Sequence, residues 1–232
     1  DYDQVMDSYA GAFQLPANED KHRSVFTFPR GATAGTAIHK LFEDEQFSFR
    51  EALQADYTER IEGVLSRYGF DKGWSSVADN MLKDVTQALI PGLQLWRVED
   101  NDQLREMEFL FSANRAEADD LFAIIRRGKK GPASASPEDF LTGFIDLTVR
   151  QNGQYFIVDY KSNHLGDQLD DYSKENLKFE IEANGYDLQY HIYALALVKF
   201  LEKRVPAFDY DTHFGGVAYL FVRGIRAGKS NG

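Results

Sequence analysis

Cysteine is absent from all 232 residues of the chain, which excludes disulfide bonds and thiolate metal sites. No run of apolar residues approaches the length that spans a bilayer, so we expect no membrane partner. Basic residues are scarce, because 26 Lys and Arg stand against 37 Asp and Glu and give a formal net charge of −11. This balance argues against broad, nonspecific binding of polyanions, while leaving room for a local basic path or for a partner that provides positive surface.

The hydrophobic content is high enough for a folded protein, at 43% of residues with 14% aromatic. A chain of this length can form one large domain or two small ones, and no internal repeat divides it. The first residue is Asp1 rather than Met, from which we expect a piece cut from a longer protein.

Apolar periodicity predicts helices first and a mixture of strands and helices afterwards. Helical spacing begins near Thr36, and further helices are expected at 49–68, 74–89, 118–125 and 186–203. Strands are expected at 104–112, at 215–224 and in a hairpin over 143–161. This order predicts an α/β fold around a mixed sheet flanked by helices, with a helical extension at the N-terminus.

The same pattern predicts how the chain is divided. We expect residues 1–34 to form an irregular segment or linker and residues 35–232 to form a single domain. Within that domain, residues 35–103 are predicted to be mainly helical and residues 104–224 to form the α/β core. A basic run at 126–130, RRGKK, opens a loop rich in Gly, Pro and Ser, which is either a solvated loop or a contact for phosphates.

The strongest local signal is the stretch GFIDLTVRQNGQYFIVDYKSN, residues 143–163. Asn152 and Gly153 separate two alternating apolar runs, which predicts a β-hairpin with a two-residue turn. In that register the numbers of opposed residues sum to 305, so Asp146 lies directly across from Asp159. A slip of one residue would carry both acids into the apolar face, so the register is well specified.

Alternation along the two strands assigns each side chain to a face of the hairpin. Asp146, Asp159 and Lys161 share one face. The other face is apolar throughout and consists of Ile145, Leu147, Val149, Phe156, Val158 and Tyr160. The hairpin therefore predicts a cluster of charges in front of an intact core.

Two directly opposed carboxylates repel each other, because their Cβ atoms lie roughly 4.5–5.5 Å apart, and they need a proton, a cation or both. A divalent metal between Asp146 and Asp159 would relieve the repulsion, and Lys161 would orient a water or stabilise developing negative charge. Oxygen ligands without thiolates suit Mg²⁺ or Mn²⁺. The alternative is that both acids lie on a solvated face and that Lys161 neutralises one of them.

The sequence G-x-x-D at 143–146 followed by D-Y-K-S at 159–162 resembles the PD-(D/E)xK nuclease superfamily, in particular its RecB-like branch. This resemblance implies a restriction-endonuclease-like core. It implies catalytic roles for Asp146, Asp159 and Lys161, with a metal held by the two aspartates.

Three further motifs extend the resemblance and imply further site residues. The G-T-x-x-H sequence that ends at His39 is similar to the branch's metal-binding histidine motif. Glu106 is similar to its strand glutamate, which implies a catalytic role, and Gln189 with Tyr193 matches its Q-x-x-x-Y signature, which implies supporting or DNA-contacting roles. Tyr160 lies inside the D-Y-K motif and is placed with this supporting group.

Longer stretches carry the resemblance from about residue 24 to residue 224, and they include SVFTFPRGATAGTAIHKLFED, DYKSNHLG, YDLQYHIYALAL and FGGVAYLFVRG. They resemble the nuclease domains of the RecB family. The resemblance implies Mg²⁺-dependent cleavage of DNA, exo- and endonucleolytic, during double-strand-break processing and the degradation of linear DNA. Mn²⁺ or Ca²⁺ could occupy the same site. It also implies RecC and RecD as partners, with a helicase feeding single strands, and the bacterial cytoplasm as the location.

Several of these residues keep an alternative interpretation. His39 and Glu43 lie four apart on one helical face, so both could approach one site. Thr36 is also a reasonable N-cap, which would make the Gly-Thr pair structural. Glu106 and Glu108 share a face of their strand, and the resemblance alone favours Glu106.

The helix at 186–203 and the function as a whole also keep alternatives. Gln189 and Tyr193 are either the polar flank of an amphipathic helix or residues that brace the site and contact DNA. Alternation places Tyr160 in the core. For the whole chain, the competing hypotheses are an inactive module that binds DNA or docks onto partner subunits, and a stand-alone endonuclease of the same superfamily.

Overall fold

The structure is a computed structural model, and it describes residues 23–112 and 140–228. Three helices come first, α2 (Ala32–Glu43), α3 (Thr58–Arg67) and α4 (Ser75–Thr86). Three strands follow, β1 (Gln103–Ser112), β2 (Phe140–Gln151) and β3 (Gln154–Lys161). The chain then forms α6 (Lys174–Asn184), α7 (Tyr186–Glu202), the short α8 (Tyr210–His213) and β4 (Phe214–Phe221).

The strands form a mixed sheet in the order β1-β2-β3-β4. β1 and β3 are antiparallel to β2, whereas β4 is parallel to β3. A parallel neighbour needs a long crossover connection, which α6 and α7 provide. The predicted α/β architecture, a mixed sheet flanked by helices with a helical N-terminal part, is confirmed.

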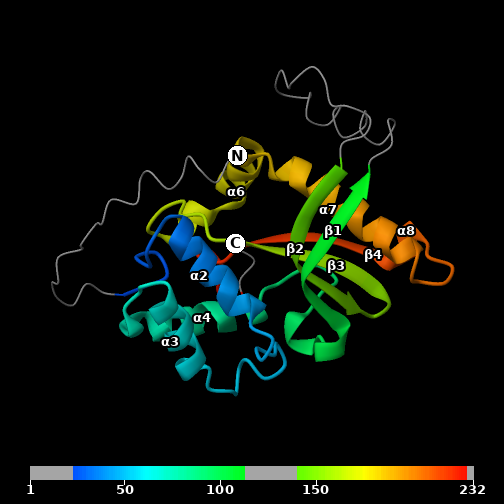
Figure 1. Cartoon of the computed structure of the whole chain (residues 1–232). Coiled ribbons are helices and arrows are strands. Elements are labelled where there is room, and N and C mark those ends of the chain that lie inside the picture. Colours follow the sequence, from blue (N-terminus) through cyan, green and yellow to red (C-terminus); the bar gives the residue numbers. More distant parts are fainter. Residues whose placement is uncertain (1–22, 113–139, 229–232) are drawn as a thin grey trace.

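Helices cover the sheet on two sides, as Figure 1 shows: α2, α3 and α4 lie on one side and α7 runs along the other. Each side has its own apolar core. The larger core joins α2–α4 to side chains such as Leu147, Val158 and Tyr160, and the smaller joins α7 to Met107, Phe109 and others of the sheet. No described helix is long and apolar enough to cross a membrane.

One helix begins later than predicted, and one helix was not predicted. The helix expected over 49–68 begins only at Thr58, whose backbone N–H donates to the Asp56 carboxylate at 2.9 Å in a local turn. The polar stretch before 186 contains a helix that was not predicted, α6, capped by Ser173 at its start and by Gly185 in the left-handed region at its end. The predicted helix at 118–125 and the basic run at 126–130 lie outside the described residues.

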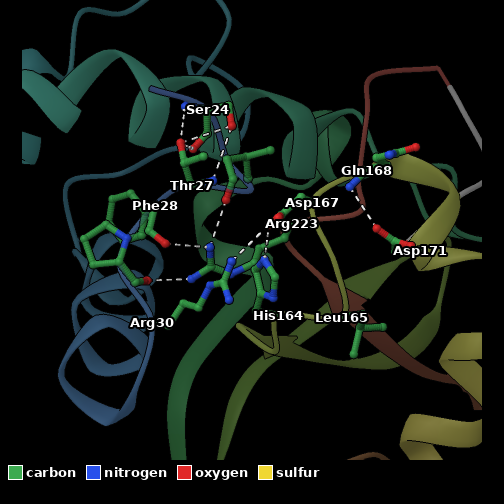
Figure 2. A network of polar contacts seen from close by, with 12 residues as sticks. Ser24, Thr27, Phe28, Arg30, His164, Leu165, Asp167, Gln168, Asp171 and Arg223 are labelled. Atoms are coloured by element: carbon green, nitrogen blue, oxygen red, sulfur yellow. Dashed lines mark hydrogen bonds and ion pairs between the residues drawn. The ribbon is translucent and has the colours of Figure 1, made fainter. Parts of the chain in front are cut away.

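A buried arginine fastens the N-terminal side of the fold to the sheet, as Figure 2 shows. Arg223 follows β4 and is 1% exposed. Its guanidinium donates to the carbonyls of Val25, Phe28 and Pro29, at 2.7–3.0 Å, and to that of Ser162, at 2.9 Å. Ser162 directly follows Lys161, so the arginine joins the end of β3 to the segment that leads into α2.

That segment belongs to the predicted irregular N-terminal stretch, of which residues 1–22 lie outside the described residues. Phe28 is 1% exposed and packs against Phe70 and Trp74, with ring centroids 5.9 and 5.3 Å apart. The helix α2 then begins at Ala32, three residues before the predicted boundary of the domain.

Candidate active site and metal centre

The hairpin has the register that its turn predicts. Five aligned pairs run from Gln151–Gln154 to Leu147–Val158, and each sums to 305. Asn152 and Gly153 both have positive φ, 52° and 81°, as a type I′ turn requires. The aligned pairs end at Leu147–Val158, one position before the predicted Asp146–Asp159 pair, and the two acids are close enough for the charge of Asp146 to raise the pKa of Asp159.

Asp146 sits where strand alternation breaks. Ile145 packs in the smaller core with Ile157, whereas Leu147 packs in the larger core on the opposite side of the sheet. The predicted placement of Ile145 on one face with Leu147 is therefore wrong. The neighbouring strand changes side at the same point, at Glu106, which has a φ of 50°, a strained value for a non-glycine residue.

The break gives the Asp146 carboxylate a backbone donor. Beyond the Leu147–Val158 pair, the N–H of Tyr160 donates to Asp146 Oδ2 at 2.9 Å. His39 Nδ1 lies 3.4 Å from the same oxygen. Burial raises the pKa of Asp146 to about 6, although the Tyr160 N–H and the charge of Lys161 act in the opposite direction.

Asp159 is 2% exposed, and its charge is balanced by Lys161, whose Nζ lies 2.6 Å from Asp159 Oδ2. Burial and, to a smaller extent, the charge of nearby Asp146 together raise the pKa of Asp159 to about 6, against the effect of Lys161. The Lys161 ammonium is thus paired with Asp159, and its charge also acts on Asp146. The alternative of a solvated acidic face is wrong for these side chains.

The first half of α7 presents polar groups to Lys161. Lys161 Nζ donates to Gln189 Oε1 at 2.8 Å, and Gln189 Nε2 donates to the hydroxyl of Tyr193 at 2.8 Å. The Q-x-x-x-Y pair is therefore joined to the lysine of the hairpin rather than left on a free polar flank. The structure brings these predicted residues together, and their chemical roles stay predictions.

Two tyrosines at Lys161 were not predicted. The Lys161 ammonium lies 4.1 Å from the ring centre of Tyr186 and 5.0 Å from that of Tyr219, within the range of cation–π interactions. Tyr186 lies three residues before Gln189 on α7, and that helical spacing could have indicated it. Tyr219 is aligned with Asp159 on the parallel strand β4, a pairing that no local pattern reveals.

The helix α2 approaches the hairpin from the other side and brings His39 to Asp146. Gly35 makes this approach possible, because a Cβ there would lie 3.0 Å from Ser162 Oγ, closer than most real contacts. Thr36 is not the N-cap, since Gly31 takes that position and Thr36 Oγ1 donates to the Ala32 carbonyl inside the helix. Burial lowers the pKa of His39, which favours the neutral imidazole that binds metals.

Glu106 faces the same helix. Burial raises the pKa of Glu106, and the charges that act on it come from Glu43, Lys40 and His39 of α2. Glu43 forms an ion pair with Lys40. Glu108, the alternative to Glu106, is exposed. Of the two strand glutamates, Glu106 is therefore the one close to the aspartates, as its effect on the pKa of Asp146 also indicates.

Tyr160 has its side chain in the core, as alternation predicts. It is 2% exposed, and its ring stacks on Phe42 with centroids 4.2 Å apart. A DNA contact through this ring is excluded by its burial. Tyr160 supports the site through its backbone N–H, which holds Asp146.

The donor set suits a divalent metal by its chemistry. Two carboxylates with raised pKa values, a neutral imidazole and the one ammonium that pairs with them among the described residues leave an excess of negative charge and of oxygen ligands. In residues 23–112 and 140–228, however, no three or more His, Asp or Glu side chains are arranged around a common point for a metal ion. The residue types therefore fit a divalent ion, and ligation by three of them requires their side chains to move closer together.

Comparison with known proteins decides the family. The model of the PD-(D/E)XK nuclease superfamily matches residues 13–230. The chain belongs to this superfamily. The resemblance carried by the D-Y-K motif is confirmed, and with it the restriction-endonuclease-like core.

Curated relatives narrow the similarity to the RecB-like branch. The chain is 36% identical over 207 residues to the RecBCD enzyme subunit RecB of Escherichia coli (strain K12), a match that covers 85% of this chain and 17% of the relative. It is 33% identical over 240 residues to the same subunit of Haemophilus influenzae, covering 100% of this chain and 19% of the relative. The chain thus spans less than a fifth of the length of these relatives.

Proposed function

We propose that the chain is a metal-dependent deoxyribonuclease domain that hydrolyses phosphodiester bonds. The observation that carries the proposal is the cluster of Asp146, Asp159 and Lys161 at the sheet's centre, in a chain of the PD-(D/E)XK superfamily. Mg²⁺ is the expected metal, and Mn²⁺ or Ca²⁺ could take its place.

Asp146 and Asp159 would hold the metal, with His39 as an imidazole ligand and Glu106 as a further acid beside them. When bound, such an ion polarises a phosphoryl oxygen and activates water. The chain's own residues position the lysine that acts beside the metal. Gln189 and the ring of Tyr186 hold the Lys161 ammonium in place, where it can orient a water and stabilise negative charge on the phosphate.

The relatives are RecB subunits of the RecBCD enzyme, which supports the proposal that this domain is part of such a complex. In that complex, the domain works with RecC and RecD in the bacterial cytoplasm. It cleaves single strands and linear duplex ends, from ends and internally, while double-strand breaks are processed. These partners and substrates belong to the proposal for the longer protein.

The experiment compares cleavage of labelled linear DNA by the purified chain and by Asp159→Asn, with Mg²⁺ and with EDTA. We expect the Mg²⁺-dependent rate of the variant to fall by about a hundredfold or more, since an amide replaces a charged ligand. Asp211→Asn is the matched control, because Asp211 is exposed on α8. Full Mg²⁺-dependent cleavage by folded Asp159→Asn would refute the assignment of this site, and a lack of Mg²⁺-dependent cleavage by the unchanged chain would favour the inactive module.

A further inference from the structure

A groove of about 590 Å³ lies between the edge strand β1 and the second half of α7. We call it the β1–α7 groove. Met107 and Phe109 of the strand and Ala196 of the helix line its apolar part. These three side chains belong to the core between the sheet and α7, and α7 lies on the side of the sheet opposite α2–α4 in Figure 1.

Two of the cations that line this groove lie against aromatic rings. The ammonium of Lys199 lies 5.7 Å from the ring centre of Phe111, and the guanidinium of Arg204 lies 3.9 Å from that of Phe200. Exposed Lys203 adds a third cation. Glu108 and Glu202 also line the groove, so the local balance is positive by one charge in a chain whose net charge is −11.

One ring of the groove contacts a residue of the candidate active site. The ring of Phe109, in the groove, packs edge-on against Tyr193 with centroids 5.9 Å apart. Tyr193 accepts from Gln189, which in turn accepts from Lys161. From Tyr193 to Lys203 the chain advances ten residues along α7 and its end, a path of about 15 Å at 1.5 Å per residue.

We propose that the β1–α7 groove binds single-stranded DNA beside the active site, an inference that rests on the proposed nuclease function. Cations interleaved with aromatic rings are the chemistry that holds single strands, because phosphates meet the charges and unpaired bases stack on rings and guanidinium planes. In a duplex the faces of the bases are stacked on one another and cannot stack on the rings. An acidic peptide would form ion pairs with the cations but would leave the rings without a stacking partner. The groove therefore recognises an unpaired strand.

The test measures binding rather than cleavage. Fluorescence anisotropy of a labelled oligothymidine of about 12 nucleotides, within the usual range of single-strand sites, is followed in EDTA with the whole purified chain. Lys203→Glu and Arg204→Glu are each expected to weaken binding roughly fivefold and to lower the slope of log affinity against log salt by about 0.7 per lost phosphate contact.

The matched control is Lys72→Glu, which makes the same charge change at an exposed lysine, 65% exposed, that pairs with Glu62 at 3.1 Å beside α3. It is expected to bind the oligonucleotide as the unchanged chain does. Phe200→Leu keeps an apolar side chain against the core and removes the ring. We expect it to weaken binding of the single strand roughly fivefold or more, without the change in salt slope.

Three outcomes overturn the inference. If the groove variants and Lys72→Glu bind alike, the groove is not the DNA path. If the groove variants weaken a blunt duplex as much as the oligothymidine, it does not select a single strand. If the groove variants bind the oligothymidine normally and lose binding to an acidic peptide, the groove binds protein rather than DNA. None of these outcomes bears on the Asp159→Asn cleavage assay, so the failure of the groove and the failure of the nuclease proposal are distinguishable.

Discussion

At the scale of single residues, the ammonium of Lys161 lies 2.6 Å from Asp159 Oδ2 and 2.8 Å from Gln189 Oε1. The rings of Tyr186 and Tyr219 lie beside it. The side chain of Lys161 is 11% exposed, so little water competes for these contacts. These contacts restrain the Lys161 side chain, so in the proposed reaction we expect Tyr186 to act through Lys161 as a positioning residue.

Two substitutions of Tyr186 distinguish the contribution of its ring from that of its hydroxyl. Tyr186→Phe keeps the ring and is expected to cleave DNA at nearly the original rate. Tyr186→Leu removes the cation–π contact, and its rate at saturating DNA is expected to fall about 2- to 30-fold, the range that 0.5–2 kcal/mol corresponds to, with KM unchanged. Single-turnover kinetics measures both. Equal losses in the two variants would instead assign the effect to the hydroxyl, which contacts Asn163.

How far single residues are predictable depends on how local their contacts are. The neighbourhood of Asp146, Asp159 and Lys161 follows from a two-residue turn, and sequence alone therefore reaches it. The contacts of Tyr219 depend on a parallel strand about 60 residues away, and those of Tyr186 on how α7 packs. Local patterns contain no such information, and the two rings were missed for that reason.

At the scale of elements, the turn of the hairpin sets the register of β2 and β3, and that register brings the two aspartates close to one another. Inserting one residue beside Gly153 shifts every pair by one position, which either separates Asp146 from Asp159 or carries acids into the core. We expect cleavage to be lost whether or not the variant folds, as checked by circular dichroism and a cleavage assay. Wild-type cleavage by the insertion variant would show that the turn does not set the site.

The break in alternation at Glu106 and Asp146 is the element-scale feature that sequence did not predict. Pattern rules assume a regular strand, and here both strands change side together, with Glu106 in the left-handed region. The residues around the break carry the site's acids. The helix α6 was missed for a different reason, since it buries none of its side chains and has no apolar stripe to reveal it.

At the scale of the whole molecule, the site exists only in the folded chain. α2 brings His39, β1 brings Glu106, the hairpin brings both aspartates and Lys161, and α7 brings Gln189. Arg223 joins the end of the hairpin to the segment that leads into α2, so the two sides of the site are fixed to one another. The order of helices and strands predicted this architecture. The role of the buried arginine could not be predicted, because its described hydrogen bonds go to backbone carbonyls, which no sequence pattern identifies.

The central claim is that the paired aspartates hold a divalent metal, and Mn²⁺ titration tests it most directly. The free ion is counted by electron paramagnetic resonance in the presence of the unchanged chain, Asp146→Asn and the surface control Asp211→Asn, with folding checked by thermal unfolding. We expect binding by the unchanged chain and by the control, a rise in their melting temperatures with Mn²⁺, and at least about tenfold weaker binding by Asp146→Asn. Equal Mn²⁺ binding by folded Asp146→Asn and the unchanged chain would contradict it.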